Sequence, residues 1–281
     1  MLHILIPTDF SNNALNALTY AQYLFKGKET TFTIFHAYEP SALQLLGNKS
    51  PLALSKIYRD LQDESEVRLS VFLSEILSRD KSTTFYYKTL SYSGHLKEGI
   101  SSLESQAYDY IIMGTKGASG LKEIFMGSTA YDIVSLKQRI PLLIIPEQAA
   151  FVNPENIGFA TDFKRGYSKE ELEPLITLTK LWKSTIRMVE VYKKTTLSPD
   201  KKAHLQELED LLAAVDYRFH VVPEFSSLEN CINIFDKELD IDLLVMIDYP
   251  KTFFESLMRE PVVNKMSFHT TLPFLILPAQ N

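Results

Sequence analysis

The segment of residues 113–129, MGTKGASGLKEIFMGST, holds the residue types best suited to a chemical role. Two residues separate Gly114 from Gly117, nine separate Gly117 from Gly127, and Ser128 follows directly. An apolar run typical of a buried strand precedes the segment, and an expected helix begins at Ser128. Glycines let a backbone approach phosphate closely, and a helix N-terminus offers free N–H groups and a favourable dipole. The spacing therefore predicts a phosphate site, although the glycines alone would also fit a tight βα connection.

A carboxylate follows the first expected strand, because residues 3–7 run directly into Thr8-Asp9-Phe10-Ser11. Ser11 is a suitable N-cap for a helix over residues 11–25. Ligands of open parallel sheets bind outside the carboxyl ends of the strands, so Asp9 and the glycines would share a pocket if the first and fourth strands are neighbours. A carboxylate accepts hydrogen bonds from a ribose hydroxyl or an amino group but repels phosphate. Asp9 should therefore mark the nucleoside end, unless it only helps to cap the helix.

These segments together resemble the universal stress protein family. The similarity rests on Pro7-Thr8-Asp9, on His36-Ala37 at the end of the second strand, and on the pattern G-x2-G-x9-G-[ST], which residues 114–128 fulfil. It is close over residues 1–147 and weaker beyond. The resemblance implies an adenine-nucleotide-binding, Rossmann-like α/β domain that holds ATP, AMP or ADP, with or without Mg²⁺. The nucleotide-binding residues it implies are Pro7, Thr8, Asp9, Ala37, Met113, Gly114, Lys116, Gly117, Gly127, Ser128 and Thr129.

The resemblance also assigns roles to these residues. Asp9 would contact the ribose or adenine, and the Ala37 backbone would meet the base. Pro7 and Met113 would line the pocket, and the residues from Gly114 onward would hold the phosphates.

The chain repeats itself at domain length. Residues 109–114, DYIIMG, match residues 242–247, DLLVMI, and residues 140–146 match residues 272–278. Residues 157–163 match residues 4–10. Such an internal repeat indicates two copies of one fold, expected over residues 1–147 and 156–281.

The second copy lacks the glycine pattern. At the positions of Gly114, Gly117, Gly127 and Ser128 it carries Ile247, Pro250, Glu260 and Pro261. A side chain restricts φ, each proline removes a backbone donor, and the glutamate repels phosphate. Asp162 remains, where it is better interpreted as a helix cap. The second half is therefore expected to bind no nucleotide.

The apolar pattern predicts the fold class: α/β, with two tandem five-stranded parallel-sheet domains covered on both faces. The expected strands are residues 3–7, 31–38, 83–91, 108–113, 141–145, 157–161, 186–192, 217–222, 243–247 and 273–277. The expected helices of the first half are residues 11–25, 56–78, 96–106 and 128–136.

The resemblance also implies how the two halves pair. In the family the last strands pair across a dimer, so residues 141–145 and 273–277 are expected to pair within this chain as an intrachain pseudo-dimer. A homodimer of the chain is the alternative. Residues 41–54 are expected to form an apolar surface turn, with a lid or a partner contact as alternatives.

Composition narrows the class of protein. Hydrophobic residues make up 45% of the 281 residues, enough for two cores, and the net charge of −6 argues against a nucleic-acid surface. No apolar run is long enough to span a membrane, and no signal peptide is evident. The single cysteine, Cys231, fits a reducing compartment, so a cytoplasmic protein is expected. The six histidines show no metal-ligand spacing, and His36 is interpreted as a packed strand histidine.

Three functional classes remain open. We favour a stress protein that acts through nucleotide-dependent binding or signalling to an unknown protein partner. A weak ATPase or phosphotransferase would need a base or a metal-organising carboxylate near the phosphates, and Asp9 lies at the wrong end. The third class is a protein-interaction scaffold that binds no nucleotide.

Overall fold

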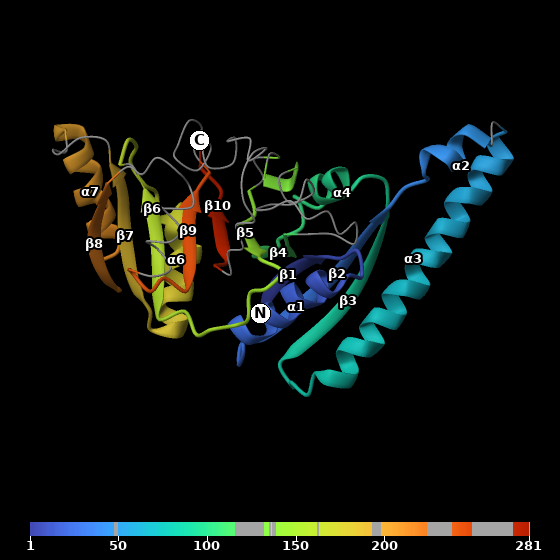
Figure 1. Ribbon diagram of the computed structural model, residues 1–281, viewed down its shortest axis with the longest axis horizontal. Coiled ribbons are helices and arrows are strands. Elements are labelled where there is room, and N and C mark those ends of the chain that lie inside the picture. The colour runs from blue at the N-terminus through green and yellow to red at the C-terminus, as the bar shows by residue number, and fades with distance from the viewer. Residues whose placement is uncertain are drawn as a thin grey trace. The chain divides into compact units, whose positions relative to one another are not determined.

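The computed structural model describes residues 1–47, 50–115, 132–134, 136, 139–161, 163–192, 198–223, 238–248 and 272–280. The chain divides into two compact units (Figure 1). The first comprises residues 1–121 and 126–140, and the second comprises residues 122–125 and 141–281.

Within its described residues, the first unit contains four parallel strands in the order β3-β2-β1-β4. The strands are β1 (Leu2–Pro7), β2 (Thr30–Tyr38), β3 (Phe85–Ser93) and β4 (Tyr110–Gly114). The helices are α1 (Asn12–Leu24), α2 (Ala42–Gly47), α3 (Pro51–Arg79) and α4 (Leu96–Ser102). The expected neighbours β1 and β4 pair directly, so two of the strands that carry predicted site residues lie side by side.

Apolar side chains explain why β1 lies inside the unit, between β2 and β4. Ile4, Leu5 and Ile6 are fully buried on consecutive positions of β1, as expected for a parallel strand that is covered on both faces. Helix α1 packs on β1 and β4, and α3 packs on β2 and β3 (Figure 1). Helix α1 begins where predicted, because the Ser11 hydroxyl accepts a hydrogen bond from the Ala14 N–H at 3.2 Å.

In the part of the second unit that the structure describes, six strands lie in the order β5-β10-β9-β6-β7-β8. They are β5 (Leu142–Ile145), β6 (Asn156–Thr161), β7 (Thr185–Tyr192), β8 (Asp216–Pro223), β9 (Leu243–Ile247) and β10 (Phe274–Leu277), with helices α6 (Lys169–Trp182) and α7 (Pro199–Leu211). All pairs are parallel except β5 with β10, which is antiparallel. This is the predicted pairing of the two terminal strands, in the register Leu143 to Leu275. Strand β5 ends the first sequence repeat, yet it clusters with the second unit, because it pairs with β10 there.

Equivalent residues of the two repeats make the same local contacts. The Asp109 carboxylate accepts a hydrogen bond from the backbone N–H of His3 at 2.7 Å, and Asp242 accepts one from Asn156 at 2.9 Å. Phe10 and Phe163 follow the Thr-Asp pairs after β1 and β6, and both adopt positive φ, 65° and 51°. Both repeats therefore place a phenylalanine with positive φ shortly after their first strand.

One prediction is wrong. Residues 41–54 are not a surface turn, because they contain α2 and the start of α3, which begins at Pro51 rather than at residue 56. Two N-caps explain the difference. The Ser41 hydroxyl accepts from the Gln44 N–H, and the Ser50 hydroxyl accepts from the Ala53 N–H just before Pro51. The predicted strands agree with the structure to within two residues. Helix α4 ends four residues before the predicted boundary at residue 106.

Candidate functional site

A cavity of about 220 Å³ opens at the carboxyl ends of β1, β2 and β4. Its walls also include one residue each from α1 and α4. The lining residues are Pro7, Thr8, Asp9, Ala14, His36, Ala37, Leu96, Met113, Gly114 and Thr115. This is the edge of a parallel sheet at which α/β proteins bind their ligands.

The cavity brings together all of the predicted site residues that the structure describes. They are Pro7, Thr8, Asp9, Ala37, Met113 and Gly114. The remaining predicted residues, Lys116, Gly117, Gly127, Ser128 and Thr129, lie outside the described residues. Of the second-half positions compared with them, Ile247 lies in β9, and Pro250, Glu260 and Pro261 are outside the described part, as are Asp162 and Cys231.

Asp9 lies at the corner between β1 and α1. Its Oδ1 accepts a hydrogen bond from the Ser11 N–H at 3.0 Å, while Ser11 itself is the N-cap of α1. The Thr8 hydroxyl accepts from the Phe10 N–H at 2.9 Å, and these two local bonds support the positive φ of Phe10. Asp9 therefore contributes to the start of the helix and also lines the cavity.

Gly114 has a packing role of its own. A Cβ atom at this position would lie 2.6 Å from the side chain of Asn13, which is buried in the first turn of α1. The absent side chain therefore lets the end of β4 approach the start of α1 at the cavity wall. Ile247 stands at the matching position of the second repeat, so such an approach is not available there.

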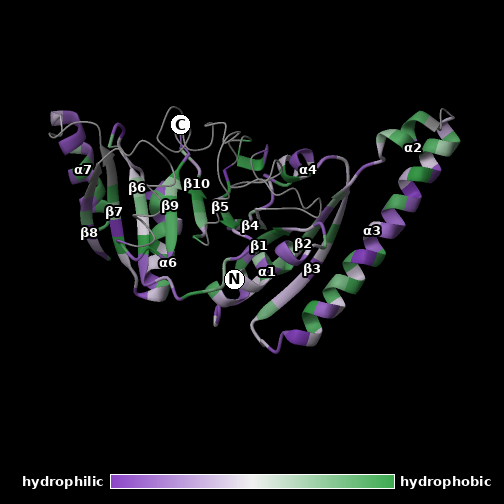
Figure 2. Cartoon of the chain, viewed as in Figure 1, coloured by the Kyte–Doolittle hydropathy of each residue, from purple (hydrophilic) through white to green (hydrophobic). Residues whose placement is uncertain are grey.

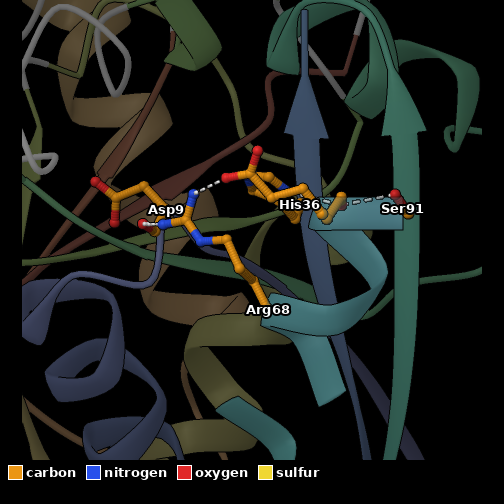
Figure 3. A network of polar contacts seen from close by, with 6 residues as sticks. Asp9, His36, Arg68 and Ser91 are labelled. Atoms are coloured by element: carbon orange, nitrogen blue, oxygen red, sulfur yellow. Dashed lines mark hydrogen bonds and ion pairs between the residues drawn. The ribbon is translucent and has the colours of Figure 1, made fainter. Parts of the chain in front are cut away.

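A hydrogen-bonded group of three side chains adjoins the cavity (Figure 3). The Nδ1 of His36 lies 2.8 Å from the Ser65 hydroxyl, which lies 2.7 Å from the Ser91 hydroxyl. His36 and Ser91 are register partners on β2 and β3, so their side chains project from the same face, where the buried Ser65 of α3 meets them. The three residues connect α3 to the cavity wall.

The His36 imidazole is neutral near pH 7. Its pKa is lowered from 6.5 to about 4, first by burial and then by the positive charge of Arg68, against opposing effects of Asp9 and Glu64. The ring also packs against Phe10, with centroids 4.5 Å apart.

Arg68 of α3 covers the same corner. Its guanidinium carbon lies 4.3 Å from the centre of the Phe10 ring, and Nη2 donates to the backbone oxygen of Asp9 at 3.4 Å (Figure 3). Glu64 lies 3.8 Å from Nη1. A cation over an aromatic ring at a partly exposed site contributes about 0.5–1 kcal/mol. Arg68 therefore helps to hold the Asp9–Phe10 turn that forms one wall of the cavity.

Sequence reasoning missed several of these residues. Ala14, Leu96 and Thr115 line the cavity, but nothing in their residue types marks them as site residues. Thr115 could have been found, because it lies inside the glycine motif. Arg68 could not, because its place depends on how α3 lies on the sheet. His36 is packed as predicted, and it also lines the cavity.

Two kinds of feature are absent from the described residues. These residues contain no cluster of three or more histidine, cysteine or acidic side chains arranged to hold a metal ion. Among the described helices, none combines the length and the apolar character that crossing a membrane would require.

Solved structures share this fold over the whole chain. A universal stress protein from Archaeoglobus fulgidus DSM 4304 has a TM-score of 0.69 at 17% identity, covering 98% of this chain and 97% of its own. A protein described as a putative universal stress protein from Pseudomonas aeruginosa UCBPP-PA14 has a TM-score of 0.56 at 12% identity, covering 98% and 92%. The cytoplasmic domain of a prokaryotic cation chloride cotransporter has a TM-score of 0.50 at 11% identity, covering 98% and 94%. Identities this low establish the fold alone, and the third example shows that the fold also occurs within a transport protein.

The comparison with curated proteins found no match. The sequence model of the universal stress protein family matches residues 1–146, slightly more than half of the chain and the part that forms the cavity. This chain therefore belongs to the universal stress protein family.

Proposed function

We propose that the first repeat binds one adenine nucleotide and that the protein acts in a stress response through nucleotide-dependent binding or signalling. One observation carries the proposal. Six residues expected from the sequence to bind nucleotide line one cavity at the carboxyl ends of β1, β2 and β4. The position of the cavity and the glycine motif thus both favour a nucleotide as the ligand.

The character of the cavity wall supports an orientation for the nucleotide. Asp9 supplies an acceptor for ribose hydroxyls, and Pro7, Ala37 and Met113 supply apolar surface for the base. The described cavity is smaller than the roughly 300–1,000 Å³ of common small-molecule pockets, so it suits the nucleoside part. The phosphates would then extend toward the glycine motif that begins at Gly114.

We assign the second repeat a supporting role. Ile247, Pro250, Glu260 and Pro261 replace the residues that would hold phosphate, so nucleotide binding is confined to the first repeat. The second repeat supplies β10, which pairs with β5 and covers an apolar strand edge that would otherwise favour aggregation. The repeats, residues 1–147 and 156–281, would thus form a pseudo-dimer within one chain.

The nucleotide that the protein carries after purification tests this proposal. The protein is denatured, and the released small molecules are separated by chromatography with ultraviolet detection. We expect adenine nucleotide from the wild-type protein and much less from Gly127→Glu, which copies the residue at position 260. Lys26→Glu, an exposed change of charge in the same unit, is the control and should retain nucleotide. If ATP neither copurifies with the wild-type protein nor binds to it when added, the proposal is wrong.

A further inference from the structure

The N-terminal half of α3 is largely exposed, and none of its residues is buried. The buried residues of α3 are Ser65, Leu69, Phe72 and Ile76, from its midpoint onward. Leu52, near the start of α3, is 85% exposed. On α2, Leu43 and Leu46 are 83% and 74% exposed. Figure 2 shows hydrophobic residues on α2 and along α3. Exposed apolar clusters of this kind mark sites of association.

One outward face of α3 combines apolar and charged residues in a particular order. Its members are Leu52, Lys56, Arg59, Asp60, Asp63 and Val67, which fall within about 100° of the helix circumference at 3.6 residues per turn. All six are exposed. The face therefore reads leucine, two cations, two anions and valine along about 22 Å of helix.

The four charges on this face have no ion-pair partner within α3. Lys56 and Asp60, and likewise Arg59 and Asp63, have the i,i+4 spacing that often supports a single helix. The ion pairs that α3 does form within 4.0 Å join Glu64 to Arg68 and Glu75 to Arg79. These four residues therefore do not stabilise α3 through ion pairs along the helix.

The order of residues on this face is complementary to itself. In an antiparallel helix pair, residues equally far from a twofold axis face each other. With the axis between residues 59 and 60, Lys56 faces Asp63 and Arg59 faces Asp60, each twice by symmetry. Leu52 of each copy then faces Val67 of the other. Opposite charges meet at the centre, and exposed apolar residues meet at both ends.

We propose that this face of α3 is a self-association surface, on which α3 of a second copy of the chain packs antiparallel. Val71, which is 65% exposed, extends the apolar part of the face beyond Val67. A lipid surface is a poorer partner, because two carboxylates lie at the centre of the face and the chain carries a net charge of −6. A single helix pair buries less than the roughly 1,200–2,000 Å² of standard interfaces, so the dimer should be weak and dissociate in the micromolar range.

Charge reversal with rescue tests the surface in the full-length chain. Sedimentation velocity over about 5–500 µM, a range that brackets a micromolar dissociation constant, is measured for Lys56→Glu/Arg59→Glu and for Asp60→Lys/Asp63→Lys. Each variant should dimerise at least about tenfold more weakly than wild type, because like charges then face each other. An equimolar mixture of the two should recover the dimer, since the acidic α3 complements the basic one. Lys26→Glu/Lys28→Glu changes the charge equally at exposed positions off this face and should match wild type.

A second variant removes apolar contact without changing charge. Leu52→Ser should also weaken the dimer, and circular dichroism should report unchanged helix content. A wild-type chain that stays monomeric at every concentration would overturn the proposal, even if it binds lipid vesicles. A wild-type dimer that both charge variants retain would overturn it as well, because the interface would then lie elsewhere.

Discussion

At the residue scale, Asp9 supports the start of α1 and is proposed to bind nucleotide, and substitution separates these two roles. Asp9→Ala should weaken ATP binding by about 1–3 kcal/mol, the usual cost of leaving buried polar partners unsatisfied. Ser11→Ala removes the N-cap of α1 and should lower the free energy of unfolding by about 1 kcal/mol without weakening ATP binding. Calorimetric titration and urea unfolding measure the two effects. If Asp9→Ala lowers stability but leaves ATP affinity unchanged, Asp9 serves only the start of the helix.

His36 should make stability depend on pH. Between its folded pKa of about 4 and its ordinary value of 6.5, the unfolded chain binds a proton that the folded chain does not. Stability is therefore lost as the pH falls from about 6.5 toward 4. From pH 7 to pH 5 the wild type should lose more stability than His36→Gln, by an amount on the order of 1 kcal/mol, after allowance for partial solvent exposure.

Urea unfolding at the two pH values measures this difference. His95→Gln is the control, because His95 is exposed and lies outside the cavity lining. If His36→Gln shows the same pH dependence as wild type, His36 does not carry the effect.

The positions of site residues at the ends of strands could be predicted from the sequence, whereas side-chain contacts between distant helices and strands could not. Asp9 and Gly114 follow apolar runs, so their place at one sheet edge depended only on β1 and β4 being neighbours. Arg68 lies 59 residues from Asp9, and its contact depends on the rotation and tilt of a 29-residue helix. No local pattern specifies that geometry.

Strand β5 is the element on which the pairing of the repeats depends. Ile144 is almost fully buried and is the register partner of Phe274 on β10. Ile144→Lys forces an ammonium group into this apolar surface, so we expect a loss of several kcal/mol or insoluble protein. Gln148→Lys, at an exposed position just after the strand, should leave the melting temperature nearly unchanged. A soluble Ile144→Lys protein that melts like wild type would show that β5 contributes little.

Most of the strands were predictable because they are short runs rich in apolar, aromatic or β-branched residues. The helices were harder. The beginning of α3 was placed too late because residues 41–54 were interpreted as a turn. Leu54, Ile57 and Leu61 already have the helical spacing that the buried residues of α3 continue. Ser50 followed by Pro51 is a local signal for the true start, and it agrees with this spacing.

The central proposal concerns the whole molecule: of its two repeats, only the first binds nucleotide. Calorimetric titration of the full-length chain with ATP tests it most directly. We predict one site per chain in the wild type and none in Gly117→Val, because a β-branched side chain would obstruct the approach of backbone to phosphate. Two comparable sites per chain, or no binding by the wild-type protein, would contradict the account.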